Sequence, residues 1–449
     1  MNTCKVAVFF WGRSLITICR ALALLALCGT SLAHADDAFD WSLHGQMTVV
    51  DQYHPAFRAD SLGTNSMSNK SLGDETFDAT LFLGLRVWDG GEIYADPEID
   101  QGFGLSNTVG MAGFPSGEAY KVGKTDPYFR LQRLFFRQTF DLGGETQNID
   151  SAQNQVAGTR TADNLILTGG KMSVTDIFDT NDYAHDPKND FLNWALIDSG
   201  AFDYAADAWG YSYGIAAEWS QDWWTLRGGL YDLSRVPNST ELETDFSQFE
   251  AVAEGEARVT LFGEAGKIKL LGWVNRGRMG DYLDAVALGI ATHTTPSTAL
   301  VREYRTRPGG VINIQQALTD DLGVFARLSL NDGSKEAYEF TEINRSVAAG
   351  LAWKGTSWGR KDDTVGFAGI VNGLSHSARD YFAAGGIGIL IGDGELAHYG
   401  SEDILETYYD AQVTSWLNVS LDYQLAINPA YNRDHGPISL FGGRLHAQW

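Results

Sequence analysis

The sequence predicts an all-β fold, a transmembrane antiparallel β-barrel of about 16 strands with short periplasmic turns and long extracellular loops. Three observations predict it: an N-terminal export signal, long strands with alternating apolar and polar side chains, and tryptophans placed at one end of those strands. No later segment approaches the roughly 18 consecutive apolar residues of a membrane-spanning helix. A membrane protein without such helices must close its sheet, because lipid leaves an open edge unpaired.

The first 35 residues have the three parts of a secretory signal peptide. These are a basic region with Lys5, Arg13 and Arg20, a short apolar core at residues 21–28, and the small-x-small cleavage site Ala33-His34-Ala35. The apolar core is too short to span a membrane. We therefore expect residues 1–35 to be removed and residues 36–449 to form one barrel domain in the outer membrane of a Gram-negative cell.

Composition excludes several classes of protein. The cysteines Cys4, Cys19 and Cys28 all lie in the signal, which excludes disulfide-stapled folds and thiol-ligated metal sites. Three of the 33 basic residues and none of the 57 acidic residues lie there, so the rest of the chain has a net charge of −27. This charge argues against a nucleic-acid partner and is typical of solvated acidic loops. We expect no cofactor.

The C-terminal strands show the clearest alternation. In residues 416–428 every second side chain from Leu417 to Ile427 is apolar, and the side chains between them are mostly polar. The last strand, which ends on Trp449, repeats the pattern. This period of two places apolar side chains against lipid and polar ones in the lumen. A terminal aromatic residue also resembles the signal that the barrel assembly machinery reads, so we expect that machinery and outer-membrane lipid as partners.

The same alternation runs upstream, through residues 77–87 and 92–99 with the tight turn Asp89-Gly90-Gly91 between them. Further short turns are predicted at residues 220–222, 265–267, 319–321 and 415–416. Strands are predicted to begin near Trp41, Glu75, Gly91, Tyr128, Asp163, Ala208, Trp223, Phe246, Gly266, Pro308, Leu322, Glu336, Asp363, Glu402, Trp416 and Pro437. One connection, residues 143–162, should be a short turn by this scheme but is long, and nothing in the sequence explains its length.

Tryptophan positions are a separate indication. Nine of the 13 tryptophans fall at a chain end or beside a predicted short turn: Trp41, Trp88, Trp219, Trp223, Trp224, Trp353, Trp358, Trp416 and Trp449. Such a girdle is typical of a membrane interface. A soluble β-sandwich also alternates, but its strands are shorter, about 5–6 residues, and its outer face is polar.

The chain resembles the carbohydrate-selective porins of the OprB type. The matching stretches are residues 41–57, 95–123, 175–204 and 425–437, and the central motif is Tyr183-Ala184-His185-Asp186-Pro187. The resemblance implies a 16-stranded barrel whose lumen is narrowed by inward-folded loops and lined by charged and polar groups. It also implies passive diffusion of monosaccharides such as glucose. One departure is Ala205, where we would expect a proline after the tyrosine.

Charged residues on predicted strands are candidates for a constriction. The basic members are Arg86, Arg130, Arg133 and Arg137, and the acidic members are Asp78, Glu92, Asp96 and Glu98. Inward charges on barrel strands tune selectivity. Arg130 does not share the inward parity of Arg133 and Arg137, so it needs a β-bulge or a place in the loop mouth. The alternative is that these charges pair with one another and only solvate a wide lumen.

Residues 173–207 are predicted to form a loop folded into the barrel. This loop contributes Asn181 and Trp194 to the candidate pathway. Trp194 could stack on a sugar ring, and the alternative is that it packs the loop against the wall. The aspartates at positions 176, 179 and 182 lack the spacing and glycine of a calcium loop, so no metal site is predicted.

The sequence therefore favours a passive porin for small neutral sugars, and not an enzyme. Its histidines form no H-E-x-x-H motif, and residues 113–117 are not a nucleophile elbow. A general cation-preferring porin is the first alternative, because of the acidic charge. An outer-membrane barrel hydrolase is the second. The choice of sugar, the ion selectivity and the assembly as a monomer or homo-oligomer stay open.

Overall fold

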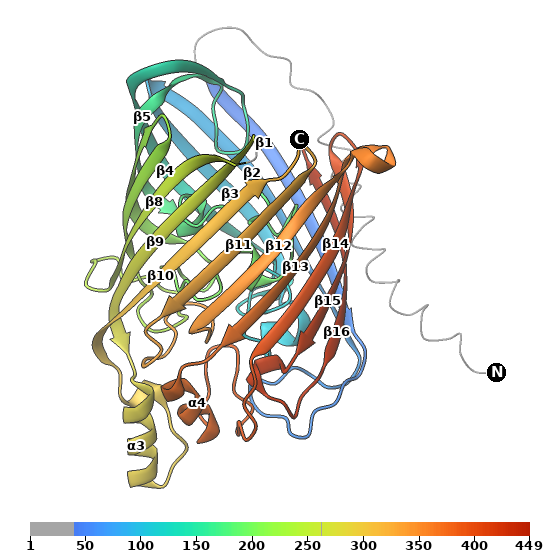
Figure 1. Ribbon diagram of the computed structural model, residues 1–449. Helices are drawn as coiled ribbons and strands as arrows, with labels where there is room; N and C mark the ends of the chain where they lie inside the picture. The colour runs from blue at the N-terminus through green and yellow to red at the C-terminus, as the bar shows by residue number, and fades with distance from the viewer. Residues whose placement is uncertain (1–39, 262) are drawn as a thin grey trace, which may run out of the picture. The chain divides into compact units, whose positions relative to one another are not determined.

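The computed structural model describes residues 40–261 and 263–449, so the predicted signal peptide lies outside the described residues. The described strands form one closed antiparallel barrel in which each strand pairs with its neighbours in sequence and β1 pairs with β16 (Figure 1). The predicted fold and its 16 strands are confirmed. Closure gives every strand two partners, which leaves no unpaired edge in the bilayer.

Most strands are long enough to cross a bilayer at a tilt. They are β1 (Trp41–His54), β2 (Leu72–Trp88), β3 (Gly91–Gly102), β4 (Lys124–Ile149), β5 (Gly158–Met172), β6 (Ser212–Gln221), β7 (Trp224–Asp232), β8 (Phe249–Leu261), β9 (Glu264–Met279), β10 (Glu303–Ala317), β11 (Leu322–Asn331), β12 (Arg345–Gly355), β13 (Arg360–Gly373), β14 (Glu402–Thr414), β15 (Leu417–Ile427) and β16 (Ile438–Gln448). The α-helices are α2 (Trp194–Ile197), α3 (Tyr282–Thr292) and α4 (His376–Ala383), and the 3₁₀ helices are η1 (Leu105–Thr108), η2 (Val174–Asp176), η3 (Thr298–Leu300), η4 (Thr356–Trp358) and η5 (Pro429–Tyr431). None of the described helices has the length and apolarity to cross a membrane.

The alternation of side chains follows the predicted parity. On β2, Leu81, Leu83 and Leu85 are exposed on the outside of the barrel. Asp78 and Thr80, which lie on the same strand but have the opposite parity, are buried inside. The tryptophans of the girdle, Trp88 and Trp223 among them, are also exposed, except Trp224, which is partly buried. The outer surface is therefore apolar and the inner surface polar, as lipid contact requires.

Connections alternate between tight turns at one end of the barrel and long loops at the other, except that β4 and β5 are joined at the turn end by a long hairpin. In the turn after β2, Gly90 has φ +70°, a left-handed conformation that glycine adopts without strain. Several predicted positions are displaced. The turn placed at residues 265–267 lies between Leu261 and Glu264, and the strands placed near Asp163 and Pro308 begin at Gly158 and Glu303. The largest error is the strand placed near Glu336, which begins at Arg345. Residues 332–344 instead form a loop whose glutamates are buried against other loops, which period-two reasoning does not detect.

The long loops turn inward and fill much of the lumen. Every residue from 191 to 207 is buried. Arginines on the wall bind carbonyl oxygens of this segment and of the residues just before it. Arg327 donates to Leu196, and Arg444 donates to Pro187 at 2.6 Å and to Asp190 at 2.8 Å. Ala205 donates its backbone N–H to Glu250 on β8 at 3.0 Å, a bond that a proline at this position could not make.

Candidate functional site

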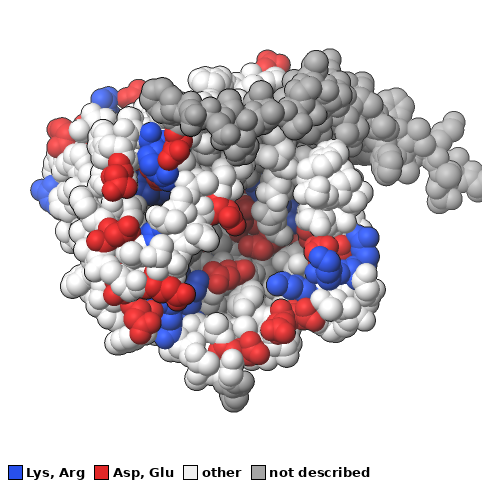
Figure 2. Space-filling model, turned by 90° about the horizontal axis from the view of Figure 1, so that it is seen from above, with Lys and Arg blue, Asp and Glu red and all other residues white. Residues whose placement is uncertain are grey.

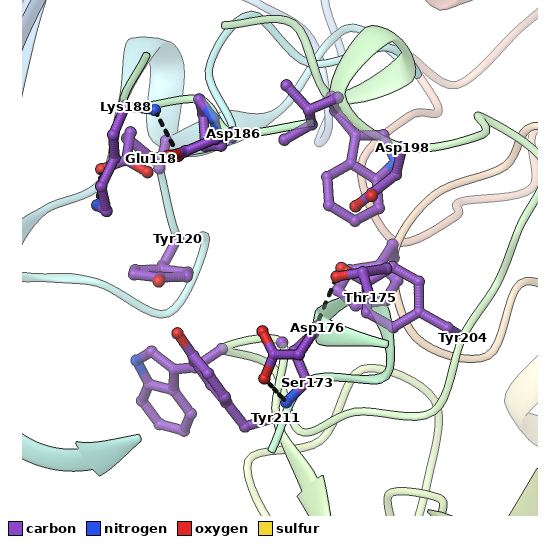
Figure 3. A pocket seen from close by; sticks show the side chains of 18 of the residues that line it. Glu118, Tyr120, Ser173, Thr175, Asp176, Asp186, Lys188, Asp198, Tyr204 and Tyr211 are labelled. Atoms are coloured by element: carbon purple, nitrogen blue, oxygen red, sulfur yellow. Dashed lines mark hydrogen bonds and ion pairs between the residues drawn. The ribbon is translucent and has the colours of Figure 1, made fainter. Parts of the chain in front are cut away.

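A cavity of about 390 Å³ lies inside the barrel, between the inward-folded loops and the wall. Residues 103–123 and 173–211 supply most of its lining. Strands β1 to β4, the connection between β4 and β5, and three further loop residues supply the rest. Seen from above, acidic and basic side chains surround the opening and continue into it (Figure 2). The close view shows aromatic rings and charged groups facing one another across the cavity (Figure 3).

One charged cluster is centred on Lys188. Its ammonium group lies 2.9 Å from Asp78 on β2 and also donates to Glu118 from the neighbouring loop (Figure 3). Burial alone would lower the pKa of Lys188, but these two carboxylates hold that pKa well above its usual value. Glu98 on β3 lies close by and accepts hydrogen bonds from Thr80 at 2.5 Å and Gln132 at 3.0 Å.

A second cluster is centred on Arg133. Its guanidinium group binds Asp176 through two hydrogen bonds of 2.8 and 2.6 Å, and it lies 3.6 Å from Asp96. Asp176 also accepts the backbone N–H of Ser173, so the arginine is joined to the loop through a carboxylate that caps a short helix (Figure 3). The same guanidinium lies 5.1 Å from the centre of the Tyr211 ring. A planar fork of donors of this kind is rigid and directional.

Arg130 reaches the lumen because β4 carries a β-bulge. Asp96 pairs with Arg133 but the next residue, Pro97, pairs with Leu131, so one residue of β4 is extra at this point. A proline cannot donate to the sheet, and the bulge restores the inward direction of Arg130. Arg130 then binds Asp207 at 2.8 Å, and its guanidinium lies 3.5 Å from the centre of the Trp209 ring. The sequence allowed either a β-bulge or a place in the loop mouth for Arg130, and the structure shows the β-bulge.

Trp194 packs among other aromatic rings. Phe114 stacks on it at 5.0 Å between ring centres, and Phe340 lies 4.7 Å away. Part of Trp194 lines the cavity, and the rings that pack on it, Phe114, Tyr204 and Phe340, come from loops. Tyr120, Trp209 and Tyr211 line the same cavity.

The structure does not bring all the predicted residues to the cavity. Glu98, Arg133 and Trp194 line it. Asp78, Asp96 and Arg130 each contact a residue that lines it, namely Lys188, Asn154 and Trp209 in that order. Asn181 binds Asn313 on the wall at 2.8 Å and is buried there. Three other residues, Arg86, Glu92 and Arg137, lie nearer the short turns, where Arg86 pairs with Glu92 at 2.9 Å.

Several lining residues are absent from the predicted set. Glu118, Tyr120, Lys188, Trp209 and Tyr211 all come from long loops. Alternation along strands carries no information about loop side chains, because loops have no fixed period. The only signal in the sequence was that these residues lie in or beside the stretches that resemble the OprB-type porins.

His185 gives the site a pH-dependent contact. Its ring lies 3.5 Å from the Asp198 carboxylate. Burial alone would lower the pKa of His185, but Asp198 holds it above the ordinary value, and burial also raises the pKa of Asp198. The ion pair therefore exists between the two pKa values. Because the histidine's pKa is raised on folding, its contribution to stability is present below about pH 6.5 and is lost as the pH rises through the folded value.

We predict that His185→Gln lowers the thermal unfolding temperature of the detergent-solubilised barrel at about pH 6 and leaves it unchanged at about pH 8.5. Unfolding scans of the wild type and the variant across this range make the measurement. The exposed histidine His293, replaced by Gln, is the control and should show no pH-dependent difference. An equal loss of stability at both pH values would contradict the role of the ion pair.

The comparisons with known proteins agree with this architecture. A search of solved structures finds the high-pH structure of Pseudomonas putida OprB, with 15% identity and a TM-score of 0.67 over 92% of this chain and 94% of that one. It also finds the outer membrane channel DcaP of Acinetobacter baumannii, with 9% identity and a TM-score of 0.49 over 92% of this chain and 99% of that one. No curated protein matches the chain.

At 15% identity, the Pseudomonas putida OprB structure supports the fold alone. The family comparison goes further, because the model described as "Carbohydrate-selective porin, OprB family" matches residues 64–449, most of the chain. The sequence resemblance is thereby confirmed. The chain belongs to the OprB family of carbohydrate-selective porins, proteins of the outer membrane.

Proposed function

We propose that this porin lets monosaccharides such as glucose diffuse passively into the periplasm, through the cavity between the inward-folded loops and the wall. The observation that carries the proposal is the pairing of charged and aromatic groups around that cavity. A sugar has hydroxyl groups that hydrogen-bond to charged side chains and ring faces that pack on aromatic rings. Tyr120, Trp209 and Tyr211 offer rings, and Arg133, Asp176 and Lys188 offer charged partners.

The basic groups at the cavity are each paired with carboxylates. Arg133 lies against Asp176 and Asp96, and Lys188 lies against Asp78 and Glu118. Paired groups keep their hydrogen-bonding directions while their fields partly cancel, so they suit the hydroxyl groups of a neutral solute. Because carboxylates outnumber basic groups in both clusters, a cation-preferring porin stays the alternative, and bilayer recordings decide between the two.

Planar bilayer recordings test the proposal. With the wild type, millimolar glucose is expected to block part of the ion current, because a sugar bound in the cavity occupies the ion path. Arg133→Ala should weaken this block and change glucose uptake in liposome swelling without unfolding the barrel. Arg235→Ala is the matched control, since Arg235 forms an exposed ion pair with Glu241 and does not line the cavity.

One outcome would contradict the sugar function, and another would contradict the role of Arg133. Strong cation selectivity with no block by glucose would support a general porin. Unchanged glucose block and uptake in the Arg133→Ala barrel would remove this arginine from the sugar pathway.

A further inference from the structure

The connection between β4 and β5 is long although it lies at the short-turn end. The two strands stay paired well beyond the other strands, from Thr146 opposite Thr161 to Ile149 opposite Gly158. This hairpin projects at the top of Figure 1, and its end bends back toward the barrel. We call residues 150–157 the hairpin tip. A free tip of eight residues would be solvated on all sides, but this one is not.

Side chains of the first and third strands hold the hairpin tip. Gln153 donates to Gln46 on β1 at 3.0 Å, and Asn154 donates to Asp96 on β3 at 2.9 Å. Val156 is 3% exposed, and its backbone N–H donates to the hydroxyl of Tyr94 at 3.2 Å. A buried apolar side chain and three specific hydrogen bonds fix the tip in one position inside the barrel.

Two of the predicted constriction arginines bind the backbone of the tip. Arg137 donates to the carbonyl oxygen of Asn154 at 2.9 Å, and Arg86 donates to that of Ala157 at 2.9 Å. Arg86 is itself held by Asp40 at 2.6 Å and by Glu92. These arginines are positioning residues, since they act on the pathway through the hairpin.

The tip forms part of the cavity wall. Gln46, Gln153 and Asn154 line the same cavity as Arg133 and the loop aromatics. Their carboxamide groups are neutral, and each both donates and accepts hydrogen bonds. Hydrogen bonds to charged groups are roughly twice as strong as those between neutral groups. A sugar that leaves the charged clusters for this amide group therefore passes from stronger to weaker partners, which favours release.

We propose that the hairpin tip is a second selectivity element of this porin: it forms the floor of the cavity on the periplasmic side, where the amides of Gln46, Gln153 and Asn154 make an exit subsite for sugar hydroxyls. The identity of the ligand rests on the proposed function. The constriction by the tip does not, because a folded hairpin in the lumen restricts any solute.

The first experiment shortens the hairpin. In one variant residues 143–162 are replaced by the dipeptide Asn-Gly, which forms a two-residue hairpin turn. Heat-modifiable electrophoretic mobility identifies the folded barrel. Single-channel conductance is expected to rise severalfold, and sugars larger than those the wild type admits should enter in liposome swelling. A folded variant with wild-type conductance and size limit would overturn the proposal.

The second experiment leaves the backbone in place and removes two amides. Asn154 has φ +53°, which glycine adopts without strain, so the variant combines Gln153→Ala with Asn154→Gly. Glucose added on the periplasmic side should block the current only at a severalfold higher concentration. Little change in conductance is expected, because the bonds from Val156 to Tyr94 and from Arg137 and Arg86 to the tip backbone stay in place. Gln155→Ala is the matched control, because Gln155 lies on the same tip and donates to Asp150 within it. Unchanged block in the double variant would overturn the exit subsite.

The two experiments separate the failure of each proposal. If glucose does not block the wild-type current at all, the proposed sugar function fails, and the conductance of the shortened barrel still decides whether the tip constricts the pore. If the shortened barrel does not fold, the double variant and its control decide the exit subsite.

Discussion

Asp203→Ala is expected to lower the free energy of unfolding by about 3–5 kcal/mol, the usual cost of removing one partner of a buried ion pair. Asp203 binds Arg307 on β10, and the two residues are 4% and 0% exposed. The same carboxylate accepts backbone N–H bonds from Tyr338 at 2.7 Å and Glu339 at 2.9 Å. The substitution would leave a buried guanidinium without its charge partner and two buried donors without an acceptor.

Urea unfolding of the barrel in lipid or detergent measures this effect. The matched control is Glu241→Ala, which removes a carboxylate from the ion pair with Arg235, both of whose side chains are more than half exposed. Exposed pairs contribute about 0–1 kcal/mol, so the control should unfold almost as the wild type does. Equal stability of the two variants would show that the pair between Asp203 and Arg307 does not hold the loops.

Glu402→Ala is expected to release the loop at residues 103–123 and to increase single-channel conductance. Glu402 on β14 is fully buried and accepts backbone N–H bonds from Ala112 at 3.0 Å, Gly113 at 2.7 Å and Ala430 at 2.8 Å. Hydrogen bonds to a charged group contribute about 1.5–3 kcal/mol each, and a buried donor left unsatisfied adds its own cost. The loop that carries Glu118 and Tyr120 into the cavity would then lose its anchor.

Conductance and limited proteolysis of the loop measure this release. Glu395→Ala removes the same charge from an exposed position in the loop that precedes β14, so it controls for the change in net charge. It should leave both measurements unchanged. If the Glu402→Ala barrel keeps wild-type conductance and its loops stay resistant to protease, then Glu402 is not the anchor.

These anchors explain part of the acidic composition. Carboxylates that accept loop backbone N–H groups are Glu250, Glu254, Glu402 and Glu406 on the wall. A buried loop must find partners for its backbone, and a carboxylate accepts several donors at once. The net charge therefore cannot be interpreted as cation selectivity without knowing where the carboxylates point.

The sequence by itself determined the barrel. Alternation along β2 and β15, tryptophans beside the turns and the number of strands all depend on neighbours in the chain, and a period of two is a local property. The inward direction of Asp96, Glu98 and Arg133 was predictable for the same reason.

Only the tertiary structure decided how the lumen is filled. Lys188 lies 70 residues from Glu118 in the chain, and Gln153 lies 107 residues from Gln46. No repeating pattern connects such residues, because loops and hairpin tips take their conformation from the groups they pack against. The bulge that turns Arg130 inward and the tip that Arg86 and Arg137 hold are decided by these long-range contacts, so strand parity could identify the arginines but not their partners.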